Sequence, residues 1–314
     1  MKLDNRFFLV IIGSIVLYAI FLLISDFNTI SDKVIKLKVE FIPIILFLVA
    51  CSWMVLFIRW NLLLKHLKII VPFKANLKIF IAGQALTTTP GQLGELIKSQ
   101  LLKTKFNIPR TKSTPIVIVE KLYDLVGAVG ASLFGIWVLG TGILVIVSAS
   151  AVLVIIFVLL SSNTNFNKFL KWFNKIKFLS KYSENISESY DVIRLSTRGT
   201  ITIFATLLSI FFWFITALAV YFVLLSFSIN TIDYLDVVSI YSASVILGAI
   251  SFLPGGIGVT EASLAGLLSL QGIEVSIALL ISVMIRIFTL WYGVGIGFLA
   301  LKMSGGFSWK STPC

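Results

Sequence analysis

The sequence predicts an all-α polytopic membrane protein, with about six full spans and two re-entrant hairpins broken by Pro and Gly. Hydrophobic residues make up 58% of the 314 residues, and the mean hydropathy is +1.02. Charged residues make up only 13%, against about 25% in a soluble domain. Several apolar runs reach the ~18 residues that can cross the hydrocarbon core of a bilayer. The solvent for this much apolar surface must be lipid.

The six predicted spans are apolar runs of helical length. They are residues 7–24, 41–58, 115–138, 143–160, 200–226 and 276–301. Two further apolar stretches, residues 79–102 and 237–271, are interrupted by Pro and Gly. The first span starts like a signal peptide but lacks a small-residue cleavage site, so we interpret it as a retained helix. We expect one transmembrane domain over residues 1–314, with repeat-like halves at 79–138 and 237–301.

The basic residues predict how the chain is oriented. Most of them fall in segments 59–80, 96–114 and 161–199 and at the two ends, which together hold 21 of the 26 Lys and Arg. Placing these segments and both termini in the cytoplasm satisfies the positive-inside rule. The broken stretch 79–102 then enters from the cytoplasm, and 237–271 enters from outside. The net charge of +12 is thereby explained by orientation in the plasma membrane, and no nucleic-acid partner is expected.

The long connection 161–199 contains a basic amphipathic pattern. Phenylalanine and leucine recur at helical spacing in residues 165–179, with lysines between them. Such a helix can lie on an anionic leaflet. The alternative is a helix packed beneath the bundle.

The two broken stretches share a motif. The first reads TTTPGQLGELIKSQLL (87–102) and the second SFLPGGIGVTEASLAGLL (251–268). Each contains Pro-Gly-x-x-Gly, then Glu, then Leu-Leu six residues after that Glu. Glu95 and Glu261 are 166 residues apart, as are Glu120 and Arg286. Opposite orientation of the two copies predicts an inverted repeat, a design in which broken helices place a substrate site near the bilayer midplane.

The breaks matter because lipid cannot satisfy free backbone groups. Pro removes an N–H, and a broken helix persists in a membrane only where protein or a wet cavity bonds its polar backbone. The helix that follows each break directs free N–H groups and a positive dipole end toward it, which suits a phosphate or carboxylate. The alternative is a kink satisfied by neighbouring helices.

Ionisable residues beside the breaks favour a functional site. A charged residue at a helix centre costs ~2.5–3.5 kcal/mol on insertion scales. Arg286 therefore needs a carboxylate partner, for which Glu261 and Glu120 are the candidates; a purely structural ion pair stays open. The candidate substrate-binding residues are Pro90, Gly91, Gly94, Glu95, Glu120, Asp124, Pro254, Gly255, Gly256, Gly258, Glu261 and Arg286. We assign no catalytic residue, metal ligand or cofactor, because Cys51, Cys314 and His66 have no ligand-spaced partners.

The same strings resemble a known family. FIAGQALTTTPGQLGELIKSQLL (80–102), VIVEKLYDLVG (117–127) and FLPGGIGVTEASLAGLL (252–268), with Arg286 and the pair Arg59-Trp60, are similar to the lysylphosphatidylglycerol synthase transmembrane region. This family is also called flippase-like or UPF0104. One departure is Lys121, where the family usually has Arg. The resemblance implies a flippase-like bundle; in the multiple peptide resistance factor such a domain moves aminoacylated phosphatidylglycerol between leaflets.

The chain ends shortly after its last predicted span, so we expect no synthase domain in it. The leading hypothesis is translocation of a phospholipid or lipid-linked headgroup, by a transporter rather than an enzyme. The alternatives are a membrane enzyme acting on a lipid-linked sugar or aminoacyl lipid, with Glu95, Glu120 or Glu261 as general base, and an accessory subunit. The expected partners are membrane lipids, anionic or lipid-linked, and a separate synthase or glycosyltransferase.

Overall fold

The protein is helical throughout its described part. The computed structural model describes residues 37–135 and 183–304, with isolated residues between 12 and 35 and between 147 and 151. No strand occurs among them, and three of their helical segments are long and apolar enough to cross a membrane. They are Val39–His66, Thr200–Ser226 and Val275–Met303. The predicted class, an all-α membrane protein, is confirmed.

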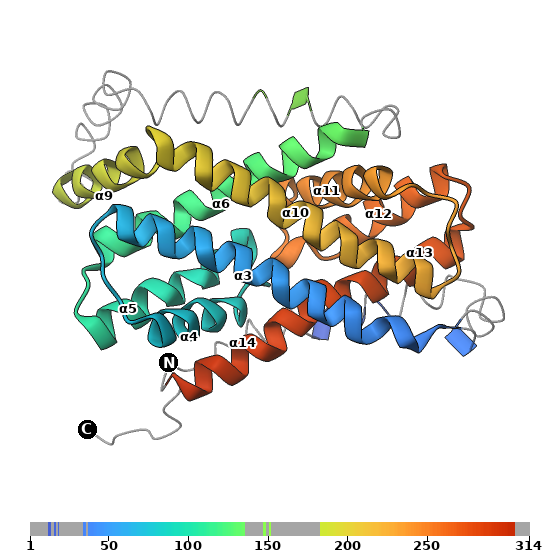
Figure 1. The fold of residues 1–314 in the computed structure, drawn as a ribbon, viewed down its shortest axis with the longest axis horizontal. Helices are drawn as coiled ribbons and strands as arrows, with labels where there is room; N and C mark the ends of the chain where they lie inside the picture. The colour runs from blue at the N-terminus through green and yellow to red at the C-terminus, as the bar shows by residue number, and fades with distance from the viewer. Residues whose placement is uncertain are drawn as a thin grey trace.

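Figure 1 shows how the described helices are arranged. The α-helices are α3 Ile42–His66, α4 Phe73–Gln84, α5 Ile97–Phe106, α6 Arg110–Ser132, α9 Ser183–Ser196, α10 Thr200–Ser226, α11 Tyr234–Ile250, α12 Val259–Leu270, α13 Val275–Arg286 and α14 Tyr292–Met303. The shorter turns are the 3-10 segments η1 Val39–Phe41, η2 Pro90–Leu96 and η5 Pro254–Gly256 and the π-helix η6 Ile287–Trp291.

Several predicted boundaries shift by one or two helical turns. The span predicted at 41–58 continues as α3 to His66, and the span predicted at 115–138 begins earlier, as α6 at Arg110. The span predicted at 200–226 coincides with α10. The predicted spans 7–24 and 143–160 fall mostly outside the described residues, and the amphipathic stretch 165–179 lies wholly outside them.

Proline and asparagine set the ends of the helices around the first break. Pro72 and Pro109 stand immediately before α4 and α6, where a residue without an N–H removes no helical hydrogen bond. Asn107 ends α5 in the left-handed conformation, at φ 57°, which Asn tolerates better than most side chains. Lys103 and Lys105 lie in the last turn of α5, where positive charge is favoured by the helix dipole.

Buried apolar side chains form two large clusters, one toward each end of the bundle. One cluster gathers α4 and α5 with parts of the long helices, and the other gathers α11, α12 and α13. In Figure 1, α4 and α5 lie at one end, α11 to α13 lie at the other, and α3 and α10 run across both. Helices α3, α6 and α10 each contribute side chains to both clusters.

Polar residues interrupt the apolar side chains of these three helices at or close to the crossover between the clusters. Ser209 of α10 and Asp124 of α6 stand between the two sets of apolar side chains, and Arg59 of α3 and Glu120 of α6 stand within the set that includes α4 and α5. Arg59, Ser209 and Glu120 are each at most 1% exposed. The helices therefore carry a polar layer through the middle of an apolar bundle.

Small residues let the helices approach closely. A Cβ atom added to Gly127 of α6 would lie 2.7 Å from backbone and side-chain atoms of Ser209, and one added to Gly297 of α14 would lie 2.2 Å from the backbone nitrogen of Ala85. Real Cβ contacts are never this short, so both crossings require glycine. Close approach at small residues is how helices gain packing energy in lipid, which gives no hydrophobic drive for association.

A π-helix interrupts the last long helix. Residues Ile287–Trp291 form η6, directly after Arg286 and before α14. Such one-turn bulges insert an extra residue into the helical ladder and are frequent at functional sites. Arg286 and Gly297 thus lie on either side of a local change in helical register.

Replacing Gly297 with Ala should destabilise the protein by about 1–3 kcal/mol, because the added methyl overpacks against the backbone of Ala85. Gly295, two residues earlier on the same helix, has no atom within 4 Å of an added Cβ. Gly295→Ala is therefore the matched control, and its helix propensity should leave stability unchanged or slightly raised. Thermal unfolding of the purified proteins in detergent measures both. Equal melting temperatures for the two variants would contradict the close crossing of α14 and α4.

Candidate functional site

The first break reverses the chain between α4 and α5. Thr89 is extended, as the residue before a proline is expected to be, and Gly91 and Gln92 both have left-handed backbone, at φ 59° and 55°. The hydroxyl of Thr89 accepts a hydrogen bond from the Gly94 N–H at 2.6 Å. A Cβ on Gly94 would lie 2.5 Å from Leu86 atoms. Glycine is therefore needed where η2 closes back onto the end of α4.

The second break has the same construction. Leu253 is extended before Pro254, and Gly255 and Gly256 are both left-handed, at φ 61° and 66°. Gly258, the N-cap residue directly before α12, has φ 91°, and its N–H donates to Glu261 Oε2 at 2.7 Å. Glu261 therefore caps the helix that follows the break. This N–H is satisfied from within the protein, although the sequence suggested it for a bound anion.

The two breaks contact one another inside the molecule. Segments η2 and η5 pack together, and a Cβ added to Gly255 would lie 3.4 Å from the Cα of Thr88. Helices α4 and α5 pack against each other beside the first break, and α11 and α12 do so beside the second. Two similar turns that lie far apart in the sequence therefore meet between the two apolar clusters.

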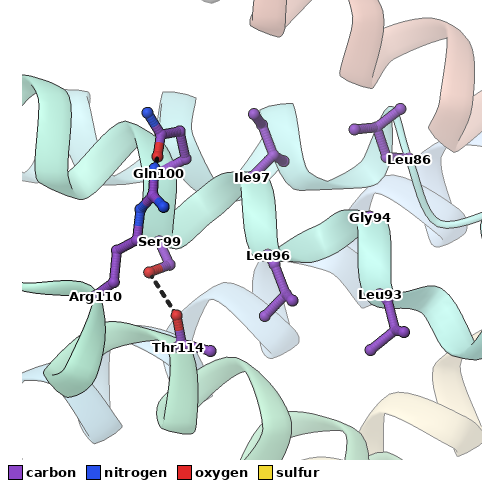
Figure 2. A pocket seen from close by; sticks show the side chains of 9 residues that line it. All are labelled: Leu86, Leu93, Gly94, Leu96, Ile97, Ser99, Gln100, Arg110 and Thr114. Carbon is purple, nitrogen blue, oxygen red and sulfur yellow. Dashed lines mark hydrogen bonds between the residues drawn. The ribbon is translucent and has the colours of Figure 1, made fainter. Parts of the chain in front are cut away.

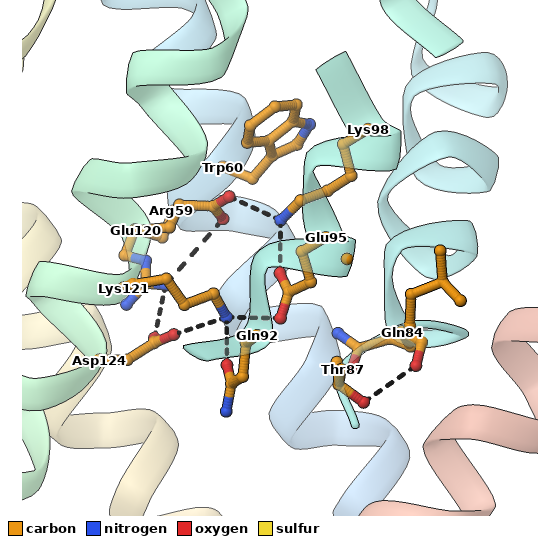
Figure 3. A network of polar contacts seen from close by, with 12 residues as sticks. Arg59, Trp60, Gln84, Thr87, Gln92, Glu95, Lys98, Glu120, Lys121 and Asp124 are labelled. Atoms are coloured by element: carbon orange, nitrogen blue, oxygen red, sulfur yellow. Dashed lines mark hydrogen bonds and ion pairs between the residues drawn. The ribbon is translucent and has the colours of Figure 1, made fainter. Parts of the chain in front are cut away.

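A network of six charged side chains lies beside the first break. It contains three cations, Arg59, Lys98 and Lys121, and three carboxylates, Glu95, Glu120 and Asp124. Figure 3 shows Glu95 between two lysines: Lys98 Nζ lies 2.9 Å from Glu95 Oε2, and Lys121 Nζ lies 2.5 Å from Glu95 Oε1. Lys98 also reaches Glu120, at 2.7 Å.

Arg59 connects the network to helix α10. Its Nη2 donates to Asp124 Oδ1 at 2.7 Å, and its Nη1 donates to the Ser209 hydroxyl at 2.6 Å. Lys121 Nζ donates in addition to Asp124 at 3.2 Å and to the Gln92 side chain at 2.7 Å. The network therefore joins α3, the first break, α5, α6 and α10. Since its formal charges cancel, the cost of burying each charge is offset by close partners.

Lys98 is enclosed by glycine and aromatic neighbours. Its side chain is 1% exposed, and its stem passes 2.9 Å from the position of a Cβ on Gly83. Its ammonium lies 4.9 Å from the ring centroid of Trp60 and 5.3 Å from that of Phe80. Aromatic faces attract a cation at these distances. Lys121, with 26% of its side chain exposed, is the cation that faces open space.

A second, smaller cluster lies beside the second break. Arg286 Nε donates to Glu261 Oε1 at 2.9 Å, and Arg286 Nη2 donates to the backbone carbonyl of Gly255. Tyr18, one of the isolated described residues of the N-terminal part, donates its hydroxyl proton to Glu261 Oε1 at 2.9 Å. Glu261 is thus completely buried and fully engaged. The sequence offered Glu261 and Glu120 as partners for Arg286, and in the structure Arg286 pairs with Glu261.

A cavity of about 670 Å³ connects the six-residue charged network beside the first break with Arg286 beside the second break. At one end it is lined by the six-residue network, and at the other by Arg286 and by Gly255 and Gly256 of the second break. Aromatic and aliphatic side chains form the walls between the ends: Trp53, Leu56, Phe80, Leu125, Phe212, Trp213, Tyr241, Val245 and Ile246. The cavity is large enough for a lipid headgroup and part of its chains, and it offers both charge and apolar surface.

The family model of the lysylphosphatidylglycerol synthase transmembrane region matches residues 10–297, nearly the whole chain. The chain belongs to this family. A UPF0104 membrane protein of Pyrococcus horikoshii is 26% identical over 93% of this chain and 95% of its own length. A second UPF0104 membrane protein, of Methanocaldococcus jannaschii, is 27% identical over 63% of this chain and 84% of its own. These relatives confirm the resemblance seen in the sequence.

In this member of the family, the structure places most of the predicted residues around the cavity. Those that line it are Gly91, Glu95, Glu120, Asp124, Gly255, Gly256 and Arg286. Gly258 and Glu261 lie behind the lining, where they fix the start of α12 and hold Arg286. Gly94 faces the opposite side of η2, and Pro90 and Pro254 shape the turns rather than line the cavity.

The sequence analysis left the network's cations out of the candidate site. Arg59 and Lys98 were counted among the exposed residues of the basic connections, and the structure buries both side chains instead. Lys98 lies three residues after Glu95, on the same helical face, which was a usable signal. Arg59 belongs to α3 because this helix runs past residue 58 to His66. Among the described residues, no group of His, Cys, Asp and Glu could hold a metal ion.

Replacing Glu261 with Gln should destabilise the protein by about 3–5 kcal/mol, because it leaves the buried Arg286 without its counter-charge. Glu274→Gln removes an exposed carboxylate from the connection before α13 and should change little. Replacing both Glu261 and Arg286 with Gln should cost less than the sum of the two single changes. Melting temperatures in detergent complete this double-mutant cycle; strict additivity would show that the two side chains are not coupled.

Proposed function

We propose that the protein moves a phospholipid or a lipid-linked headgroup between the two leaflets of the membrane. The observation that supports this function is the cavity that joins both breaks, with charged groups at its ends and apolar walls between them. An amphiphile needs both kinds of surface at once. A site for a small polar solute would need few apolar walls, and a site for a hydrocarbon would need no charges.

The charged groups suit the parts of a lipid headgroup. Arg286 lines the cavity with Glu261 behind it, and Lys121 is the network's most exposed cation. These two cations are the groups that would meet a lipid phosphate. Glu95 and Asp124 also line the cavity and would accept a cationic substituent of the headgroup. The pairs that these residues form with one another would be exchanged for pairs with the substrate, so that no buried charge is left alone during the transfer.

We further propose that the two broken segments are re-entrant hairpins of an inverted repeat. The paired left-handed residues after Pro90 and Pro254 support this arrangement, as does the contact between η2 and η5. Residues 7–24 and 143–160 would complete six full spans. In this arrangement the hairpins approach from opposite leaflets, and their tips form the substrate site, as in transporters built from discontinuous helices.

The orientation and the partners follow from the same proposal. The basic segments and both termini would face the cytoplasm, in the plasma membrane, because 21 of 26 Lys and Arg lie in the segments assigned to that side. The substrate would be an anionic or lipid-linked lipid. A separate synthase or glycosyltransferase would be the enzyme that makes it or uses it.

Lys121→Gln should slow lipid transfer about tenfold or more, because a hydrogen bond to a charged group contributes about 1.5–3 kcal/mol. The fold should survive, since Lys98 still pairs with Glu95 and Arg59 still pairs with Asp124. The measurement is leaflet exchange of fluorescent phosphatidylglycerol and of a polyprenyl-phosphate lipid in proteoliposomes. Lys112→Gln, an exposed change on the same helix, is the control. Exchange no faster than in protein-free liposomes, for both lipids, would contradict the proposed function.

Cysteines introduced singly at Lys105 and at Asn230 should be labelled from opposite sides of the membrane. In a chain whose Cys51 and Cys314 are replaced by Ala, a cysteine at Lys105 should react with a membrane-impermeant maleimide only after the cells are permeabilised. A cysteine at Asn230 should react in intact cells. Both positions are exposed, Lys105 in the last turn of α5 and Asn230 in the connection between α10 and α11, so labelling measures sidedness rather than burial. Labelling of both from the same side would contradict the proposed topology.

A further inference from the structure

A second hollow lies on the outer face of the first break (Figure 2). Its volume is about 390 Å³, and it is bounded by η2, the turn that follows α4, α5 and the start of α6. One part of its wall is apolar, with Leu86, Leu93 and Ile97. The other part is polar, with Gln100, Arg110 and Thr114. We call this hollow the outer groove.

The outer groove and the central cavity share a single wall. Gln92, Glu95 and Lys98 face the central cavity, whereas Leu93, Gly94 and Ile97 face the groove. The residues alternate between the two sides because η2 and the first turn of α5 form a wall that is only one helix thick. The groove is therefore a separate space and contains none of the six charged network residues.

The polar part of the groove carries a cation whose partner is neutral. Arg110 donates a hydrogen bond to the side-chain carbonyl of Gln100, and no described carboxylate lies within ion-pair distance of it. The whole segment 96–114 holds five basic residues and no acid. The hydroxyl groups of Ser99, Ser113 and Thr114 lie together beside it, with Ser99 2.9 Å from Thr114. This end of the groove suits a phosphate, which Arg can bind with two parallel hydrogen bonds.

The apolar part of the groove calls for a hydrocarbon chain. Leu93 is 62% exposed at the tip of the break, and it stands in the same wall as Leu86 and Ile97. In a membrane protein, such a surface is covered by acyl chains. A positive polar end joined to an apolar channel matches an anionic phospholipid better than a free phosphate, which would leave the leucines bare. A second copy of this basic segment would be repelled by the positive charge of the groove.

We propose that the outer groove is a binding site for one anionic phospholipid, with its phosphate at Arg110 and Gln100 and an acyl chain along Leu86, Leu93 and Ile97. This inference does not depend on the proposed transport, because a lipid can be held here whether or not the protein moves another through the central cavity. A lipid bound at this place would pack against the outer side of the first break.

Photocrosslinking can test this site directly. A benzophenone amino acid is placed at Leu93, in the groove, or at Ile58, which is 51% exposed on α3 and serves as the control position. The full chain is reconstituted in nanodiscs of phosphatidylcholine that contain 20% phosphatidylglycerol, as an experimental choice within the range of anionic membranes. Mass spectrometry then counts the crosslinked lipids. We expect phosphatidylglycerol to be enriched several-fold at Leu93 over its share of the bilayer, and to match its share at Ile58.

Substitutions at the polar end give the decisive comparison. Arg110→Gln should abolish the enrichment at Leu93, and Arg110→Lys should retain part of it, since charge remains but paired hydrogen bonding is lost. Lys112→Gln, which removes an exposed charge two residues away, should leave the enrichment intact. Elution profile and melting temperature verify that each variant is folded.

Three results would overturn the proposal. The first is no enrichment at Leu93 in the unsubstituted chain, which would mean ordinary boundary lipid. The second is an equal loss in the Arg110 and Lys112 variants, which would mean attraction by the general positive field. The third is crosslinking of Leu93 to a second copy of the chain. Normal transport with no enrichment would reject the groove alone, whereas enrichment without transport would reject the proposed function alone.

Discussion

The structure depends on the pairing of charges that are kept from water. A lone charge in hydrocarbon is costly, whereas three cations and three carboxylates with cancelling charge can be buried together. Here the six groups come from α3, the first break with α5, and α6, and Arg59 extends the set to Ser209 of α10. Each of these elements is therefore held in register by its neighbours. The apolar clusters on either side contribute buried surface area. Many packings of Leu, Ile and Val are nearly equal in energy, and the ion pairs select one of them.

The two breaks solve one backbone problem in two ways. Each has an extended residue before proline and two left-handed residues after it, and each needs a partner for an N–H freed by the turn. In the first break the partner is the Thr89 hydroxyl, which leaves Glu95 to join the network. In the second break it is Glu261 itself, which also holds Arg286. Both glutamates stand six residues before a Leu-Leu pair, yet Glu95 lines the cavity and Glu261 lies behind its lining.

Much of this arrangement could be predicted from the sequence, and the limits have physical causes. Composition and run length predicted a helical membrane protein, and the repeated Pro-Gly motif located both turns. Arg286 could be expected to need a carboxylate, because an isolated charge in a span is rare. The burial of Arg59 and Lys98 was not predicted, because positive-inside counting treats Lys and Arg between apolar runs as exposed. Local hydropathy does not reveal that a distant carboxylate, such as Glu120 for Lys98, will neutralise them.

The choice between the roles of Glu95 and Glu261 also lies beyond the sequence. Glu95 follows the last glycine of its motif by one residue and Glu261 by three, which changes the face of the helix on which the carboxylate stands. Spacing of this kind is informative only when the helix start is known to the residue, and 3-10 turns such as η2 move it. The meeting of the two breaks depends on the packing of the whole bundle, which no local pattern encodes.

The π-helix beside Arg286 has a consequence for how this helix tolerates change. Five residues, Ile287–Trp291, hold one more residue than an α-helical path of the same kind would take. Upstream, the chain must aim a guanidinium at the second break; downstream, it must lay Gly297 on the backbone of Ala85. Straightening these residues into a regular α-helix without removing one would turn everything after them by roughly 100°, whereas deleting one residue together with the bulge would leave the later part facing nearly the same way. The bulge thus changes the rotational phase between Arg286 and Gly297. One continuous helix can therefore place both residues against their partners.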